Sequence, residues 1–159
     1  IDGLHDFAAK LLFLRDKIKQ EQENKDLLEK IKQSKNLYES HMNNDLNVSD
    51  ALAVFHEFTN LINKRIDGKT LDKSSLISAI EFLRTFNQVF DVIDFNKVEE
   101  QQKIPEQAKE LIAKREELRK VKNFKEADKI RDELKTAGIL LEDTPYGTLW
   151  KKVDLTQNL

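Results

Sequence analysis

Apolar residues recur every three or four positions along most of the chain, which is the spacing of one face of an α-helix. In its first part the pattern predicts four helices, at residues 4–21, 25–42, 49–66 and about 72–93. The third shows the apolar stripe most clearly, with Ala51, Val54, Phe55, Phe58, Leu61 and Ile62. Four amphipathic helices with short connections are typical of a bundle, which we expect over residues 1–95.

Turn-forming residues separate these helices. A polar stretch at residues 19–25 and an Asn- and Asp-rich stretch at 42–47 supply the first two connections. We expect Gly68 to end the third helix in a left-handed conformation, and Asp72 or Ser74 to cap the fourth.

The pattern changes after residue 95. Residues 96–103 are polar and charged, which predicts a linker. Pro105 suits the first position of a fifth helix that reaches about Lys122. Asn123 and Glu126 form a capping box for a sixth helix that ends at Gly138. Because the two helices are nearly contiguous, they should fold back as an antiparallel hairpin.

Two short strands follow the helical hairpin, at residues 139–142 and 148–153, with a turn at 143–147. The expected fold class is therefore mainly α, a four-helix bundle followed by a small α+β appendage over residues 104–153. The appendage combines the helical hairpin with a short antiparallel β-hairpin. Residues 154–159 are expected to form a frayed tail.

Composition agrees with a helical chain, because only two prolines and four glycines interrupt it. The absence of cysteine excludes disulfides and thiolate metal sites within the chain. No apolar run approaches the roughly 20 residues that span a bilayer. The first residues contain neither an initiator Met nor a signal peptide. We expect an interior piece of a longer cytoplasmic protein, monomeric and without a membrane partner.

Sequence patterns of catalytic and metal sites are missing. The three histidines, His5, His41 and His56, are dispersed, and no glycine-rich phosphate loop occurs. The carboxylates lie among Lys and Arg on helix faces, where ion pairing is their ordinary role. We therefore expect no catalytic residue, no metal ligand and no cofactor in this chain.

Charge singles out one region. The net charge of −2 argues against a uniformly basic nucleic-acid-binding domain. Residues 109–135 nevertheless contain ten Lys or Arg and seven Asp or Glu, so this segment has a local positive excess.

The order of residues in the same region carries a family resemblance. Within residues 114–134 the chain places Arg119, Asn123-Phe124 and Ala127-Asp128, and then continues with G-I-L-L-E-D at 138–143 and G-T-L-W at 147–150. This order and spacing over about 40 residues resembles the end of bacterial cysteinyl-tRNA synthetases.

A second stretch resembles the same family. M-N-N-D-L-N at residues 42–47, followed by Asp50-Ala51-Leu52, is similar to part of the helical-bundle domain named for its D-A-L-R signature. Ala53 stands where the fourth signature residue would be, and Val48-Ser49 replaces the family's Thr-Pro. Asn47 is then the expected cap of the third helix.

The resemblance implies a class I parent enzyme that ligates cysteine to tRNA-Cys with ATP, and that holds zinc through cysteines and histidine in a nucleotide-binding domain. The family's signatures H-I-G-H and K-M-S-K-S are absent from this chain. The implied ATP and zinc sites therefore belong to a missing N-terminal catalytic domain, and this fragment should be inactive alone. The implied partners are tRNA-Cys and that domain.

By position, the family's anticodon contacts carry over to Arg119, Phe124, Asp128 and Asp143. Unpaired bases stack on aromatic rings, and carboxylates accept hydrogen bonds from the amino groups that all three bases of a GCA anticodon carry. Phe124 stands where Trp is common in the family. A further set of cations could contact phosphates, which would position the RNA without reading its sequence: Lys114, Arg115, Lys120, Lys122 and Arg131.

Other interpretations of these residues remain open. Phe124 is also typical of a packing residue, Asp128 of an ion pair with Arg131 or Arg119, and Asp143 of a turn, so a bundle without any ligand would fit. Residues 127–133 also resemble the helical hairpin of nucleotide-excision-repair proteins, which docks onto a like hairpin. A helical protein-interaction module is therefore the alternative function. Trp150 is expected to pack against the helical hairpin.

Overall fold

A computed structural model describes residues 2–19, 23–44 and 46–154, and the chain divides into two compact units. Unit 1 is Ile1–Asp94 and unit 2 is Phe95–Leu159. The predicted connections at 19–25 and 42–47 and the predicted tail at 154–159 fall partly outside the described residues. Each unit has its own core.

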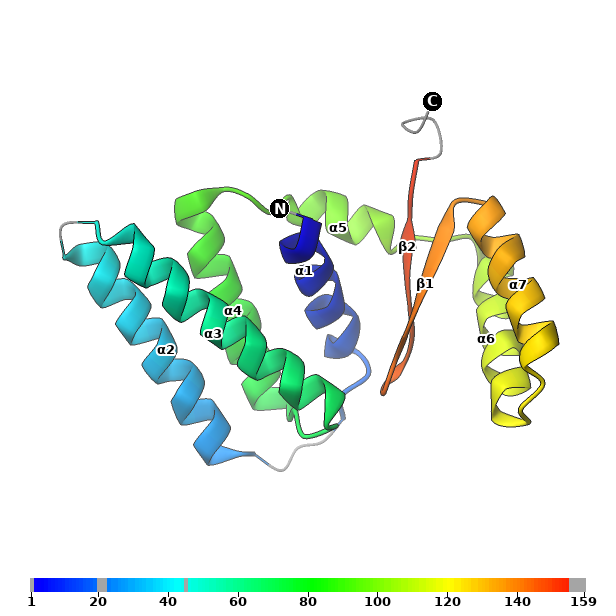
Figure 1. Cartoon of the computed structure of the whole chain (residues 1–159), viewed down its shortest axis with the longest axis horizontal. Helices are drawn as coiled ribbons and strands as arrows, with labels where there is room; N and C mark the ends of the chain where they lie inside the picture. Colours follow the sequence, from blue (N-terminus) through cyan, green and yellow to red (C-terminus); the bar gives the residue numbers. More distant parts are fainter. Residues whose placement is uncertain (1, 20–22, 45, 155–159) are drawn as a thin grey trace. The chain divides into compact units, whose positions relative to one another are not determined.

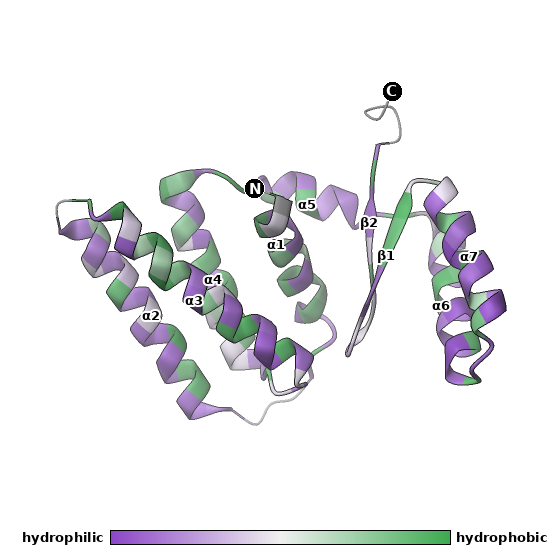
Figure 2. Cartoon of the chain, viewed as in Figure 1, coloured by the Kyte–Doolittle hydropathy of each residue, from purple (hydrophilic) through white to green (hydrophobic). Residues whose placement is uncertain are grey.

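Unit 1 is a bundle of four helices, shown in Figure 1: α1 (Asp2–Arg15), α2 (Lys25–Asn43), α3 (Val48–Asp67) and α4 (Lys73–Phe90). Helix α2 packs against α3 and α4, and α1 packs against α4. Apolar and hydrophilic residues are interspersed along α2 and α3 (Figure 2), as expected for helices that bury one face. The predicted bundle is confirmed.

Aromatic rings fill the core of unit 1. The rings of Phe55 and Phe86 stack with centroids 3.6 Å apart, and the centroids of Phe58 and Phe82 are 4.5 Å apart. Tyr38 contacts Phe82 edge-on. All five side chains are at most 4% exposed, so they supply a large apolar area to the bundle.

Helix ends in unit 1 follow the sequence in two places and depart from it in two. Asn47 caps α3 and Asp72 caps α4, where the Asp72 carboxylate accepts from the backbone N–H of Ser75 at 2.9 Å. The predicted left-handed Gly68 is wrong, because Gly68 has φ −79° and Lys69 has φ 53°. Helix α1 ends at Arg15 rather than near residue 21.

Unit 2 combines three helices with a β-hairpin: α5 (Phe95–Gln101), α6 (Glu106–Lys120), α7 (Phe124–Thr136), β1 (Ile139–Thr144) and β2 (Gly147–Lys152). Helices α6 and α7 form the predicted hairpin, α7 contacts β1, and α6 contacts β2. The strands are antiparallel, and Asp143 pairs with Thr148.

Two local predictions in unit 2 need correction. Residues 96–103 were expected to form a linker, but most of them lie in α5, where buried Val98 anchors the helix. Pro105 is the N-cap of α6 rather than its first residue, because its ψ of 150° is extended. Its carbonyl still accepts from the N–H of Ala108 at 3.0 Å, so the helix begins directly after it.

The core of unit 2 is small and aliphatic. It consists of Ile104, Ala108, Ile112, Ile130, Leu134 and Ile139. Trp150 packs against this cluster, as predicted, and its indole N–H donates to the carbonyl of Gln102 at 2.7 Å. This core joins the helical hairpin to the β-hairpin and so fixes the side chains that lie between them.

Candidate nucleic-acid interface

The turn between α6 and α7 places an arginine beside an aromatic ring. Asn123 caps α7 by accepting from the N–H of Glu126 at 3.4 Å, as predicted, and Lys122 turns the chain with φ 59°. Arg119 in the last turn of α6 thereby lies over Phe124, with its guanidinium carbon 5.8 Å from the ring centroid. This distance is within the range of a cation–π contact.

The β-hairpin places a carboxylate opposite α6. Gly147 has φ 121°, a conformation that L side chains rarely adopt, and the hydroxyl of Thr144 donates to the Gly147 carbonyl at 2.6 Å. The turn thereby sets Asp143 on β1 opposite Thr148 on β2. The N–H of Thr148 donates to Oε1 of Glu116 on α6 at 2.8 Å, which ties the hairpin to the helix.

Arg115 on α6 is the main partner of Asp143. Its Nη1 lies 2.7 Å from Asp143 Oδ1 and its Nη2 lies 2.8 Å from Oδ2, so the two groups form a bidentate pair. The Arg115 side chain is fully buried, whereas that of Asp143 is 35% exposed. Asp143 therefore keeps an open side that the buried arginine does not cover.

Charge and burial act on these groups in opposite directions. The hydrogen bonds from Arg115 hold the pKa of the Asp143 carboxyl below its ordinary value, although burial opposes this shift. The same bonds raise the pKa of Arg115 above its ordinary value, and the negative charge of Asp128 adds to that shift. Both partners are consequently ionised at neutral pH.

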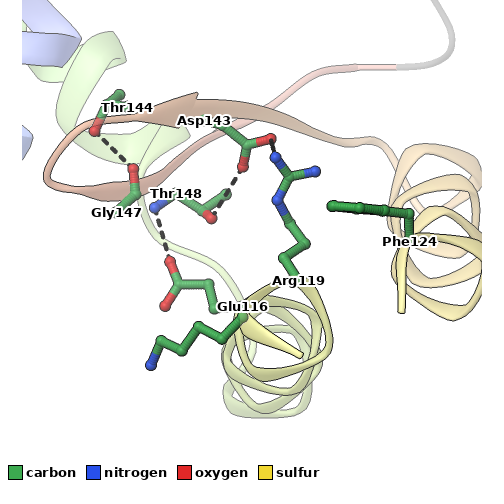
Figure 3. A pocket seen from close by; sticks show the side chains of 8 residues that line it. Glu116, Arg119, Phe124, Asp143, Thr144, Gly147 and Thr148 are labelled. Atoms are coloured by element: carbon green, nitrogen blue, oxygen red, sulfur yellow. Dashed lines mark hydrogen bonds and ion pairs between the residues drawn. The ribbon is translucent and has the colours of Figure 1, made fainter. Parts of the chain in front are cut away.

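A cavity of about 390 Å³ opens between the helical hairpin and the β-hairpin. In Figure 3, Arg119 lies between Asp143 and Phe124, and its Nη2 is 3.5 Å from Asp143 Oδ2. The cavity is lined by Glu116, Arg119, Lys120, Phe124, Asp143, Thr144, Gly147 and Thr148. It offers a half-exposed aromatic face, a guanidinium and carboxylate acceptors within one space.

The structure thus brings together three of the four residues predicted for anticodon contact. Arg119, Phe124 and Asp143 line this cavity, whereas Asp128 lines a second hollow of about 620 Å³ that also includes Arg131. Asp128 and Phe124 are one turn apart on α7, so the two hollows share that helix. The alternative of a packed Phe124 does not fit, because this ring is 51% exposed.

The predicted phosphate contacts divide into two groups. Lys114, Lys120, Lys122 and Arg131 are exposed and could reach a phosphate. Lys120 pairs with Glu117 at 2.6 Å, but exposed pairs of this kind are weak and easily exchanged. The prediction for Arg115 is wrong, because its side chain is buried against Asp143 and cannot meet a phosphate.

Sequence reasoning missed the roles of Glu116 and Thr148 and the true position of Arg115. One signal was present, since Arg115 falls on the buried face of α6 together with Ala108 and Ile112. An arginine on an apolar stripe indicates a buried partner of opposite charge. No local pattern identified that partner, which lies 28 residues away in sequence.

In the described part of the chain, no group of three or more His, Asp or Glu side chains could hold a metal ion. Among the described helices, none has both the length and the apolar character needed to cross a membrane.

Comparison with known proteins gives a match for each unit. Residues 37–94 match the model of the DALR domain, and residues 101–150 match the model of the cysteinyl-tRNA ligase anticodon binding domain. The first match lies within the bundle of unit 1. The second covers the helical hairpin and the β-hairpin that surround the cavity.

Curated relatives carry the same family description. The chain is 36% identical to a cysteine–tRNA ligase of Thermococcus onnurineus over 85% of its own length, and 36% identical to that of Lactobacillus gasseri over 79%. It is 42% identical to that of Archaeoglobus fulgidus over 72%. The matched parts make up 29%, 26% and 24% of these relatives, so the chain spans about a quarter of their length. The chain belongs to the cysteinyl-tRNA ligase family and holds that family's DALR domain followed by its anticodon-binding domain.

Proposed function

We propose that this chain recognises tRNA-Cys and reads its GCA anticodon with the residues around the cavity of unit 2. The observation that supports this most strongly is the meeting of Arg119, Phe124 and Asp143 around one open space. These groups come from α6, α7 and β1, so only the folded unit assembles them. The match of residues 101–150 to an anticodon-binding domain supports the same proposal.

Each side chain has a distinct task in this proposal. The exposed ring of Phe124 stacks on an unpaired base, which contributes about 1–3 kcal/mol of binding energy. Asp143 accepts a hydrogen bond from a base amino group through its open side. Arg119, already positioned between them, stacks on a base or bonds a base acceptor. Asp128 accepts from a further base in the neighbouring hollow.

Phosphate contacts complete the interface. Lys114, Lys120, Lys122 and Arg131 are exposed cations on the two helices that carry Arg119 and Phe124. They attract the RNA backbone and set its register, and they do not discriminate between bases. The bundle of unit 1 holds the anticodon stem in this proposal, in keeping with its DALR-domain match.

The parent protein is proposed to be a cytoplasmic, monomeric ligase that joins cysteine to tRNA-Cys with ATP. The relatives are cysteine–tRNA ligases that extend well beyond the matched part. In this proposal the chemistry belongs to a catalytic domain outside this chain, and the chain alone does not aminoacylate tRNA. The two family matches favour this function over the protein-interaction module.

Affinity for RNA tests the proposal. The chain should bind an anticodon stem-loop with GCA more tightly than three stem-loops that each carry one replaced base. Affinity should also fall as salt rises, because phosphate contacts release counterions. Lys122→Gln is the matched control, since losing an exposed cation should weaken all four RNAs alike. Equal affinity of the wild-type chain for all four RNAs would show that the chain does not read the anticodon.

A further inference from the structure

Arg115 is an unusual residue for the centre of a small unit. Its side chain is fully buried, and it is among the largest fully buried side chains of the described residues. Burying an ionised group costs several kcal/mol unless a partner compensates it. Asp143 compensates it, and the pair joins α6 to β1.

Hydrogen bonds restrict the Asp143 carboxylate from two sides. Oδ1 accepts from Arg115 Nη1 at 2.7 Å and from the hydroxyl of Thr148 at 3.3 Å. Oδ2 accepts from Arg115 Nη2 at 2.8 Å. Because the guanidinium is planar and bonds both oxygens, it fixes the plane of the carboxylate as well as its position.

The number of open acceptor positions decides which hydrogen bonds Asp143 can still form. A carboxylate has about four acceptor positions, two on each oxygen. Both positions of Oδ1 and one position of Oδ2 are occupied by Arg115 and Thr148. The remaining position of Oδ2 faces Arg119, whose Nη2 is 3.5 Å away, a distance too long for a good hydrogen bond.

We propose that Arg115 is a positioning residue that sets base specificity, because it leaves Asp143 one acceptor position that only a hydrogen-bond donor, such as a base amino group, can fill. This inference rests on the proposed function and adds to it a residue that does not touch RNA. A base that presents a carbonyl at that position would face a fixed negative oxygen without a proton to share. It would therefore bind more weakly than a base with an amino group.

The proposed base selectivity also depends on the ionised state of Asp143. A protonated carboxyl could donate a hydrogen bond and would accept a carbonyl base, so selectivity requires the charge. Arg115 and Arg119 from α6 both lower the pKa of Asp143, and the hydroxyl of Thr148 from β2 does so as well. Asp128 from α7 acts on the pair by raising the pKa of Arg115.

The experiment measures discrimination, which is the ratio of the affinities for the GCA stem-loop and for a stem-loop with one replaced base. The 159-residue chain is titrated with the GCA stem-loop and with three stem-loops that each replace one base. Asp143→Asn identifies the position that Asp143 reads, because discrimination there should be lost. Arg115→Lys keeps the charge but lacks the planar pair of N–H donors that fixes the carboxylate. It should therefore lower discrimination about tenfold at that same position, the effect of one hydrogen bond to a charged group.

Arg15→Lys in α1 is the matched control, because Arg15 is 55% exposed and has no part in the site. Discrimination by this variant should equal that of the wild-type chain. An Arg115→Lys chain that is folded and discriminates like the wild type would overturn the inference. So would an equal loss of affinity for all four RNAs, which would indicate a purely structural role. If the wild-type chain binds all four equally, the proposed function fails, and the inference fails with it.

A measurement without RNA keeps the inference testable if Arg115→Lys does not fold. Carbon-13 NMR of the side-chain carboxyl follows the titration of Asp143 in the wild-type chain. We expect its pKa to lie below the ordinary Asp value near 4. A wild-type titration at or above the ordinary value would overturn the claim that Arg115 holds this carboxylate.

Discussion

The two units of the chain bury different kinds of side chain. Unit 1 buries aromatic rings, and Phe55, Phe58, Phe82 and Phe86 contact one another in its core. Unit 2 buries a small aliphatic cluster and, beside it, the charged side chain of Arg115. Packing contacts, which have little directional preference, hold the core of unit 1. Unit 2 adds the hydrogen bonds of Arg115, which require a particular geometry.

If the proposed function holds, this difference separates a supporting unit from a recognition unit. Apolar burial stabilises a fold roughly in proportion to the area removed from water, but it presents nothing specific to a ligand. A buried ion pair adds little net stability, yet it fixes the orientation of the groups that it joins. Unit 2 therefore buries a charged side chain, and not an apolar one, at the place where it holds Asp143 in one orientation.

The largest effect on stability is expected from the aromatic core. Phe58→Ala removes a side chain that is 1% exposed and in contact with Phe7, Phe55 and Phe82. We expect the free energy of unfolding to fall by about 3–5 kcal/mol, measured by urea unfolding. Phe124→Ala is the matched control, because that ring is 51% exposed and should cost less than about 1 kcal/mol. Similar losses in both variants would remove the distinction between core and site.

The ion pair should respond unequally when its two partners are removed. Asp143→Ala leaves the buried guanidinium of Arg115 without a partner, which we expect to cost about 2–4 kcal/mol. Arg115→Met leaves a carboxylate that is 35% exposed and still near Arg119, and the new side chain fills the space. This variant should cost about 1–2 kcal/mol, again from urea unfolding. A larger loss for Arg115→Met would contradict the view that burial of the arginine dominates the pair.

Acid should weaken unit 2 through Asp143. Its pKa is lower in the folded than in the unfolded chain, so the unfolded chain takes up a proton first as the pH falls. The stabilisation is full above the ordinary Asp pKa near 4 and is lost as the pH drops from there through the depressed folded value. Unfolding by urea at several pH values should show this loss, and Asp143→Asn should lack it. An identical pH dependence in that variant would count against an ionised Asp143.

The smallest effect on stability is expected at Arg119. Its contacts with Phe124 and Asp143 are partly exposed, at 5.8 Å and 3.5 Å, so Arg119→Gln should change the free energy of unfolding by less than about 1 kcal/mol. The same change should clearly weaken binding of the GCA stem-loop, because Arg119 lines the cavity between Asp143 and Phe124. A variant that loses stability but keeps its affinity would reverse the assignment of Arg119 to recognition.

Most of the fold was predictable because its signals are local. The apolar stripes located α2, α3 and α4 to within a few residues, and Asn47, Asp72 and Asn123 cap helices as expected. Helix α5 was not predicted, because a mostly polar segment becomes helical through the burial of Val98, which is a tertiary contact.

The site was predictable only in part, for a related reason. The resemblance selected Arg119, Phe124 and Asp143, and the structure places them around one cavity. The sequence predicts a phosphate contact for Arg115 because it shows only a basic residue in a segment rich in Lys and Arg. Its burial depends on the β-hairpin, which brings Asp143 to it from 28 positions away, and no periodicity reports such a contact.

The most direct test of recognition by unit 2 is an NMR titration of the isotope-labelled chain with the GCA stem-loop. We expect shifts in the signals of the Arg119 guanidinium, the Phe124 ring and the Asp143 carboxyl, and smaller shifts at these groups with a base-replaced stem-loop. Signals from the buried rings of Phe55 and Phe82 should stay unchanged. RNA binding that leaves Arg119, Phe124 and Asp143 unshifted, or that shifts them equally with every stem-loop, would contradict anticodon recognition by unit 2.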